Sequence, residues 1–173
     1  MRMSFLFSLI GLFAIGLSPA LAGLSDIEIK AVREKLGEDV SRKDGDTRVS
    51  KKEILYNITL QSKTFKDLSR LDVKYMIFYY DASFGSTEKV EEKSKSGSEK
   101  VAFLKGNSSF TFKTDPIVLT TEQLDGNVYW ANGASGKSKD RVSGIWVRVY
   151  NDQGEIVEEY ANPTSITKRI WKE

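Results

Sequence analysis

The stretch Ile54-Leu-Tyr-Asn-Ile-Thr-Leu-Gln61 alternates apolar and polar side chains at every second position. Tyr56, Ile58 and Leu60 share one side of an extended chain, whereas Asn57 points to the other side. This period of two predicts a β-strand that has one face in a hydrophobic core and the opposite face toward water.

A second alternating stretch, Leu71 to Tyr80, is apolar along one whole face. Its other face begins polar, with Asp72 and Lys74, and ends apolar, with Phe78 and Tyr80. The pattern predicts a strand covered on one face at its start and on both faces at its end, as in the centre of a sandwich. We expect this strand to pair with Ile54–Gln61.

Further strands are predicted at Ser109–Lys113 and at Gly144–Tyr150, where apolar side chains again alternate. Asn151-Asp-Gln-Gly154 then suits a turn, and the β-rich run Glu155–Tyr160 follows it, so we expect a hairpin with a bulge. Ile27–Leu36 fits a strand or a helix, and its place before a strand-rich chain favours a strand.

Three polar stretches separate these runs and are predicted to be loops: Asp39–Lys52, Asp81–Lys100 and Asn132–Asp140. Neither side of any of them could close a core of its own, so they do not divide the chain into domains. Many short strands with turn-rich gaps predict an all-β fold. We therefore expect residues 23–173 to form a single antiparallel immunoglobulin-like β-sandwich.

The first segment, Met1–Ala22, has the pattern of a secretory signal peptide: one charge at Arg2, an apolar run to Leu17 and small residues at the end. The apolar run is short for a bilayer span, which takes about 20 residues. We expect cleavage after Ala22 and a secreted or periplasmic product with no stable membrane span.

The composition excludes several kinds of chemistry. The 173-residue chain has no histidine and no cysteine, which removes the commonest general base, the commonest zinc ligands, every thiol nucleophile and every disulfide. Its 26 basic and 24 acidic residues nearly balance, whereas nucleic-acid binders carry clustered excess cations. We expect no cofactor, no metal and no nucleic-acid partner.

Several segments resemble the immunoglobulin-like or fibronectin-like modules of secreted bacterial proteins. Asn57-Ile-Thr-Leu-Gln, Phe65-Lys-Asp-Leu and Leu71–Asp81 are similar to the B and C strands of these modules. Gly144–Tyr150 and the turn after it are similar to their closing hairpin. The resemblance implies an immunoglobulin-like sandwich and brings no catalytic residues. The chain departs from antibody-type domains in lacking their cysteine pair.

The segment Ala131-Asn-Gly-Ala-Ser-Gly-Lys-Ser138 fits a relaxed phosphate-loop pattern. A true phosphate loop needs a helix that begins at the Lys-Ser pair, because the helix N-terminus holds the anion. Here a predicted strand follows instead. A flexible hairpin loop is therefore the favoured interpretation.

The same region carries the candidate ligand-binding residues Tyr129, Trp130, Lys137, Lys139 and Arg141. Aromatic faces stack on sugars, and neighbouring cations hold acidic groups, so a glycan or another envelope protein is the expected partner. The alternative interpretation is that the tryptophan is buried and the lysines are simply solvated.

Paired carboxylates could support glycoside hydrolysis, and the candidates are Asp115, Asp125, Asp140, Glu158 and Glu159. Adjacent Glu158 and Glu159 would point to opposite faces of a strand, where they would protect a sheet edge. We therefore expect a non-catalytic binding or structural module of the cell envelope. A carboxylate-dependent hydrolase acting on glycans and an inhibitor that presents a loop are the alternatives.

Overall fold

The computed structural model describes residues 25–88, 90–126 and 130–172, and most of them lie in β-strands. The predicted signal peptide, Met1–Ala22, lies outside the described residues. The elements are β1 Ile27–Lys43, β2 Thr47–Ser62, β3 Leu68–Asp81, β4 Glu91–Leu104, β5 Ser109–Lys113, β6 Ile117–Leu124, β7 Lys137–Lys139, β8 Arg141–Tyr150, β9 Ile156–Asn162 and a 3₁₀ helix, η1, Thr164–Lys168. None of the described segments forms a helix long and apolar enough to cross a membrane.

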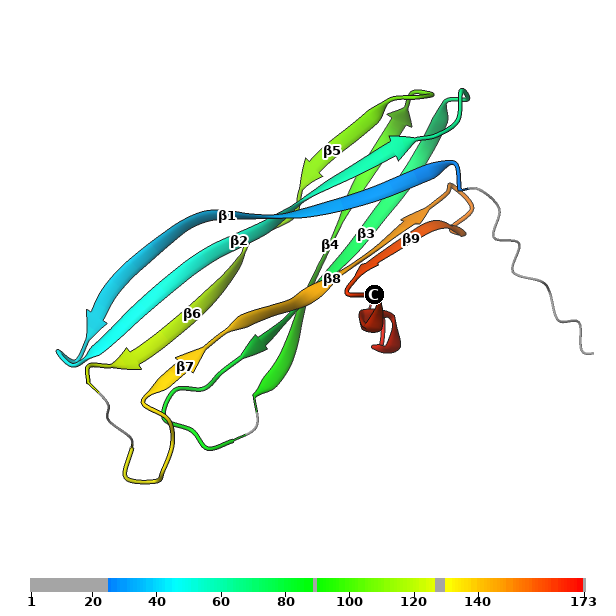
Figure 1. Cartoon of the computed structure of the whole chain (residues 1–173). Coiled ribbons are helices and arrows are strands. Elements are labelled where there is room, and N and C mark those ends of the chain that lie inside the picture. The colour runs from blue at the N-terminus through cyan, green and yellow to red at the C-terminus, as the bar shows by residue number, and fades with distance from the viewer. Residues whose placement is uncertain (1–24, 89, 127–129, 173) are drawn as a thin grey trace, which may run out of the picture.

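Two antiparallel sheets lie face to face, which confirms the predicted all-β sandwich (Figure 1). Sheet A has the order β1-β2-β6-β7, with β5 also paired to β2. Sheet B has the order β4-β3-β8-β9. Strands β5 and β6 pair with consecutive parts of β2, β5 with Asn57–Gln61 and β6 with Thr47–Ile54.

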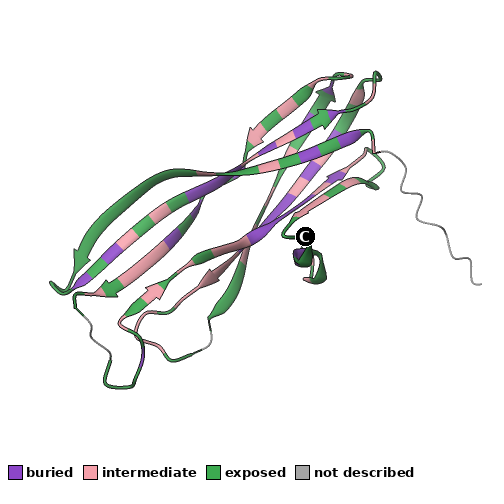
Figure 2. Cartoon of the chain, viewed as in Figure 1, coloured by how far each residue is buried: buried purple, intermediate pink, exposed green. Residues whose placement is uncertain are grey.

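The main core lies between the central parts of the two sheets, where Figure 2 shows the buried segments. Ile58 and Leu60 of β2 and Ile77 of β3 have no solvent-accessible surface. Burying aliphatic side chains of this size contributes about 1.5–3 kcal/mol each. The alternation that predicted these two strands therefore reports a real core face.

The predicted pairing of Ile54–Gln61 with Leu71–Tyr80 is wrong. The first segment lies in β2 of sheet A and the second in β3 of sheet B, so the two face each other across the core. Their actual neighbours are β1, β5 and β6 for β2, and β4 and β8 for β3. Two strands with apolar faces are equally compatible with pairing side by side and with packing face to face.

Two of the three predicted loops are also largely strand. Asp39–Lys52 contains the end of β1, a turn at Asp44-Gly45-Asp46 and the start of β2. Within Asp81–Lys100, the residues from Glu91 onward form β4, an edge strand of sheet B. Both segments lack apolar alternation because charged residues are normal on exposed arms and edge strands. Asn132–Asp140 is a loop apart from the short strand β7.

The predicted hairpin after Tyr150 is confirmed. Asn151 N–H donates to Glu155 O over 3.0 Å, and Gly154 has a φ of 79° that the missing Cβ permits. A register shift between Val149 and Tyr150, in the pairing of β8 with β9, marks the predicted bulge.

One aspartate fixes the place where the chain passes from sheet A to sheet B. Asp140 stands between β7 and β8, and its Oδ2 accepts a hydrogen bond from Thr120 N–H in β6 over 2.8 Å. Its Oδ1 accepts one from Ala82 N–H, just after β3, over 2.9 Å. A single carboxylate thus ties the backbones of both sheets together.

A tyrosine makes a second tie between the sheets. Tyr75 of β3 lies over Gly97 of β4, where an added Cβ would meet its hydroxyl at 2.3 Å. The Tyr75 hydroxyl accepts a hydrogen bond from Asp115 N–H, between β5 and β6, over 3.0 Å. Burial raises the pKa of Tyr75, so the hydroxyl stays protonated.

A second apolar cluster lies on the outer face of sheet B. Met76, Phe78 and Trp146 are buried there beneath Ile166 of η1, which has no exposed surface. Arg169 anchors the same C-terminal segment through an ion pair with Glu92, Nε to Oε2 2.7 Å. This cover explains why the second face of Leu71–Tyr80 turns from polar to apolar along the strand.

Candidate functional site

The end of β1, the start of β2, and the strands β6 and β7 carry a polar surface on sheet A, and we call this part of the sheet the arm. We call the hollow on this surface the arm groove. The groove is a hollow of about 230 Å³ lined by Glu38, Arg48, Ser50, Lys52, Thr121, Gln123, Lys137 and Lys139. Arg48, Ser50 and Lys52 lie on the same face of β2 as the core residues, because the side chains of a strand alternate with a period of two. The same sheet face is therefore apolar in the core and cationic in the arm.

Cross-strand pairing arranges these side chains in rows. Arg48 of β2 pairs with Gln123 of β6, which pairs with Lys137 of β7. In the next row, Ser50 pairs with Thr121, which pairs with Lys139. Rows two residues apart are about 6.7 Å from each other. Positive charges therefore stand beside hydrogen-bonding hydroxyl and amide groups along one surface.

The one carboxylate of the groove, Glu38, is already neutralised. Lys35 Nζ lies 2.7 Å from its Oε2, Ser50 Oγ donates to its Oε1 over 2.6 Å, and Lys52 Nζ lies 3.5 Å from Oε1. The hydrogen bond from Lys35, and then that from Ser50, lower the pKa of Glu38 to about 2. The carboxylate stays ionised near neutral pH and cannot act as a general acid there.

Three of the four cations that line the groove are available to bind a ligand. Arg48, Lys137 and Lys139 are exposed, and within the described part of the chain none of them makes an ion pair. Lys52 is held by Glu38. The groove thus presents three uncompensated positive charges and the neutral donors Thr121 and Gln123.

The structure brings two of the five predicted ligand-binding residues together. Lys137 and Lys139 both line the arm groove. Trp130 is 40% exposed and contacts Phe84 edge-on, with ring centroids 5.6 Å apart. Arg141 lies over the Tyr80 ring, 4.7 Å from its centroid. Tyr129 lies outside the described residues.

The separation of Lys139 from Arg141 follows from the change of sheet at Asp140. Lys139 is the last residue of β7 in sheet A, whereas Arg141 is the first residue of β8 in sheet B. Residues two apart in one strand would share a face. Because the chain leaves one sheet for the other between them, their side chains serve different surfaces.

The phosphate-loop pattern has no helix behind it. The Lys137-Ser138 pair at its end begins the strand β7, so the anion-holding helix N-terminus of a phosphate loop is missing at this point.

The five candidate catalytic carboxylates are dispersed, and none of them lines the arm groove. Asp140 holds the two sheets together, Asp125 pairs with Arg42 at 3.3 Å, and Glu159 pairs with Arg148 at 2.6 Å. Glu158 and Glu159 pair with adjacent residues of β8 and point to opposite faces of the edge strand β9, as predicted. Within the described residues, no group of three or more acids could hold a metal ion.

Sequence reasoning missed Arg48 and Lys52, because it assigned Asp39–Lys52 to a loop. It missed Glu38 because that residue lies between the predicted strand Ile27–Leu36 and this loop. A signal for the correct structure was present. Asp44-Gly45 adopts positive φ values of 52° and 78°, and an Asp-Gly pair between two β-rich runs is a strong hairpin signal. A hairpin there would have placed Arg48 and Lys52 on one face of a strand.

Comparison with known proteins gives no family. No family model matches the chain, and no curated protein matches it. A solved structure of the Northeast Structural Genomics Consortium target SoR45 is similar at a TM-score of 0.37 and 12% identity, over 79% of this chain and 85% of that one. A protein from Akkermansia muciniphila is similar at a TM-score of 0.28 and 15% identity, over 80% and 73% of the two chains. A Bordetella pertussis protein described as ApaA is similar at a TM-score of 0.28 and 9% identity, over 79% and 92%. Likenesses this distant carry no argument about what the chain does.

Proposed function

We propose that this protein is an exported, non-catalytic binding module of the cell envelope that recognises an acidic glycan through the arm groove. One observation carries the proposal: Arg48, Lys137 and Lys139 gather on one sheet face without ion-pair partners among the described residues. Charged groups that a protein leaves uncompensated on a hollow surface are suited to a ligand of opposite charge.

The shape and chemistry of the groove favour a carboxylated sugar chain. Lysine and arginine donate charge-assisted hydrogen bonds to carboxylates, and Thr121 and Gln123 can bond the hydroxyls beside them. The arrangement does not favour hydrolysis. A general acid needs a pKa raised toward neutrality, whereas the pKa of the groove's carboxylate, Glu38, is lowered to about 2.

The test is affinity electrophoresis of the chain through gels that contain polygalacturonate or neutral dextran. We expect retardation by polygalacturonate alone, and retardation that weakens between about 50 and 200 mM salt, because the contacts are ionic. Combining Lys137→Ala with Lys139→Ala should raise the apparent Kd about tenfold or more, since each charge-assisted hydrogen bond contributes about 1.5–3 kcal/mol before solvent screening.

The matched control combines Lys66→Ala with Lys105→Ala. Both lysines are exposed and outside the groove, so this variant has the same net charge as the groove variant. Equal weakening by both pairs would show a non-specific charge effect and contradict the proposed site. Binding of an acidic envelope protein without any binding of polygalacturonate would contradict the glycan.

A further inference from the structure

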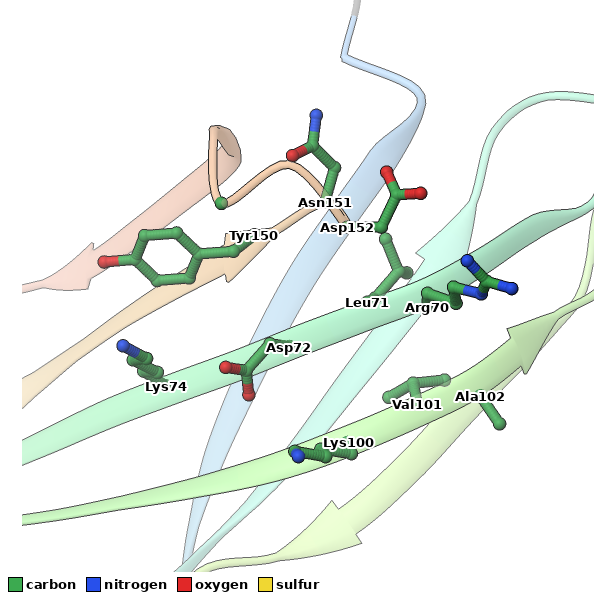
Figure 3. A pocket seen from close by; sticks show the side chains of 11 residues that line it. Arg70, Leu71, Asp72, Lys74, Lys100, Val101, Ala102, Tyr150, Asn151 and Asp152 are labelled. Carbon is green, nitrogen blue, oxygen red and sulfur yellow. The ribbon is translucent and has the colours of Figure 1, made fainter.

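A second hollow lies on the outer face of sheet B and shares no lining residue with the arm groove. Figure 3 shows the side chains that line it. Its volume is about 590 Å³, more than twice that of the arm groove at about 230 Å³. The charged residues that line it are Arg70, Asp72, Lys74, Lys100 and Asp152, and Tyr150 contributes an aromatic ring. We call this hollow the sheet B groove.

The charges of the sheet B groove are of both signs. Asp72 pairs in register with Lys100 on one side and Tyr150 on the other, yet no ion pair forms between Asp72 and Lys100. The Oδ1 atom of Asp72 is buried and has no hydrogen-bond partner among the residues that the structure describes. Such an atom is rare in a folded protein and calls for an explanation.

The backbone at the rim of the groove is strained. Arg70 has a φ of 56°, although it lies within β3 and its neighbours Ser69 and Leu71 keep regular register with β4. Glycine adopts this conformation freely, and aspartate and asparagine tolerate it, but a long side chain pays a conformational cost. Strain of this kind clusters at binding sites, where the side chain serves the ligand rather than the fold.

The mixture of charges selects the chemistry of the ligand. Asp72 and Asp152 would repel an anion, and Arg70 and Lys100 would repel a cation. A neutral hydroxyl group avoids both penalties, because it can donate to a carboxylate and accept from a lysine or an arginine. A ring such as that of Tyr150, which Lys74 covers at 5.1 Å, adds an apolar wall of the kind found in ligand sites.

The groove continues along the sheet into a third hollow of about 240 Å³ that shares Lys74 with it. Ser96, Ser98 and Trp171 line this extension, and within the described part of the chain the buried indole N–H of Trp171 has no hydrogen-bond partner. An acceptor at Asp72 and a donor at Trp171 are thus both unmatched along one continuous surface. A chain of hydroxyl-bearing rings that follows both hollows could match both.

We propose that the sheet B groove, from Arg70 and Asp72 to Trp171, binds a neutral linear saccharide. This site is separate from the arm groove and does not depend on the function proposed for it. Because the two unmatched polar atoms are covered, binding moves the side chains over them and supplies the hydrogen bonds that the protein leaves unmade.

The test is a titration of the ¹⁵N-labelled chain with four neutral hexasaccharides: cellohexaose, chitohexaose, laminarihexaose and mannohexaose. We expect at least one of them to shift the amide signals of Asp72 and Lys100 and the indole signal of Trp171. In Arg70→Gly, the apparent Kd should rise about tenfold or more, while relief of strain raises Tm by about 2 °C. A stability defect cannot produce that combination.

Asn107→Gly is the matched control, because Asn107 has a φ of 53° and lies outside the groove. It should leave the affinity unchanged. The combined Lys137→Ala and Lys139→Ala variant should also bind the hexasaccharide normally, which separates this site from the arm groove. The proposal is overturned if none of the four sugars shifts these signals, if Arg70→Gly binds as well as the unmodified chain, or if only charged galacturonate oligomers bind.

Discussion

One face of β2 contributes to the core along one part of the strand and to the arm groove along another. Along β2, Tyr56, Ile58 and Leu60 are buried in the core, whereas Arg48 and Lys52 of the same face line the arm groove. Strand β1 pairs antiparallel with β2 along both parts, with a register shift between Lys35 and Gly37 where the two parts meet. The difference lies in the cover, because sheet B packs on the first part and leaves the second open to water.

This comparison separates stability from recognition. In the core, the loss of apolar contacts should cost free energy of unfolding, and in the arm groove the loss of a lysine that makes no ion pair should cost ligand affinity alone. The following variants test that separation, from the largest expected effect to the smallest.

The largest effect is expected in the core. Ile58→Ala removes a side chain with no exposed surface and should lower the free energy of unfolding by about 2–5 kcal/mol, because it leaves a cavity. Urea denaturation measures the change. Lys139→Ala, in the arm groove, should change the same quantity by less than about 0.5 kcal/mol. Similar losses for the two variants would break the comparison.

The next effect is expected at the boundary between the two parts. Asp140→Asn replaces one of two accepting oxygens by an amide that faces a backbone N–H, so a partly buried donor loses its partner. We expect a loss of about 1–3 kcal/mol. Amide hydrogen exchange should accelerate at Thr120 or Ala82 more than at Ile58. Unchanged exchange at both amides would show that the carboxylate does not hold the sheets together.

A smaller effect is expected for the hydrogen bond between Asp115 N–H and the Tyr75 hydroxyl. Tyr75→Phe keeps the ring over Gly97 and removes only the hydroxyl that accepts from Asp115 N–H. The expected loss is about 1 kcal/mol, measured as a shift in the urea midpoint without a change in slope. A loss as large as that of Ile58→Ala would mean that the ring itself had moved.

The smallest effect is expected on acidification of the arm. The pKa of Glu38 in the fold is about 2 and its unperturbed value is 4.5, so the folded state binds protons less readily than the unfolded state. The stabilisation is therefore complete above about pH 4.5 and is lost as the pH falls toward 2. Carboxyl carbon NMR should show a Glu38 midpoint near 2. In Lys35→Ala, the midpoint should move back toward 4.5, and a midpoint that stays near 2 would assign the lowered pKa to another cause.

Much of the fold could be predicted because burial leaves a period of two in the sequence. Ser109–Lys113 is β5 with the predicted bounds, and Ile54–Gln61 and Leu71–Tyr80 lie within β2 and β3. The hairpin at Asn151–Gly154 was visible in its turn residues. The strand ends within Asp39–Lys52 and the first part of β4 were missed because most of their side chains are polar or charged and not buried, so burial imposes little pattern there.

The candidate sites were less predictable, since they combine residues that are far apart in the chain. Lys137 and Lys139 could be selected from a cationic stretch near aromatic residues, but Arg48 joins them only through pairing across β6. Arg70 and Trp171 line adjoining hollows although a hundred residues separate them. No local sequence pattern indicates that residues so far apart in the chain line the same surface.

The amino-acid sequence by itself determined that this chain folds as strands around an apolar core, because alternation along a strand is a local consequence of one-sided burial. It also determined that no thiol or imidazole chemistry is available. Only the tertiary structure decided which strands pair and which face each other, where Asp140 moves the chain between sheets, and which charges are left without partners. Those properties depend on contacts between distant segments, and the free energy of such contacts is not written in any single stretch of the chain.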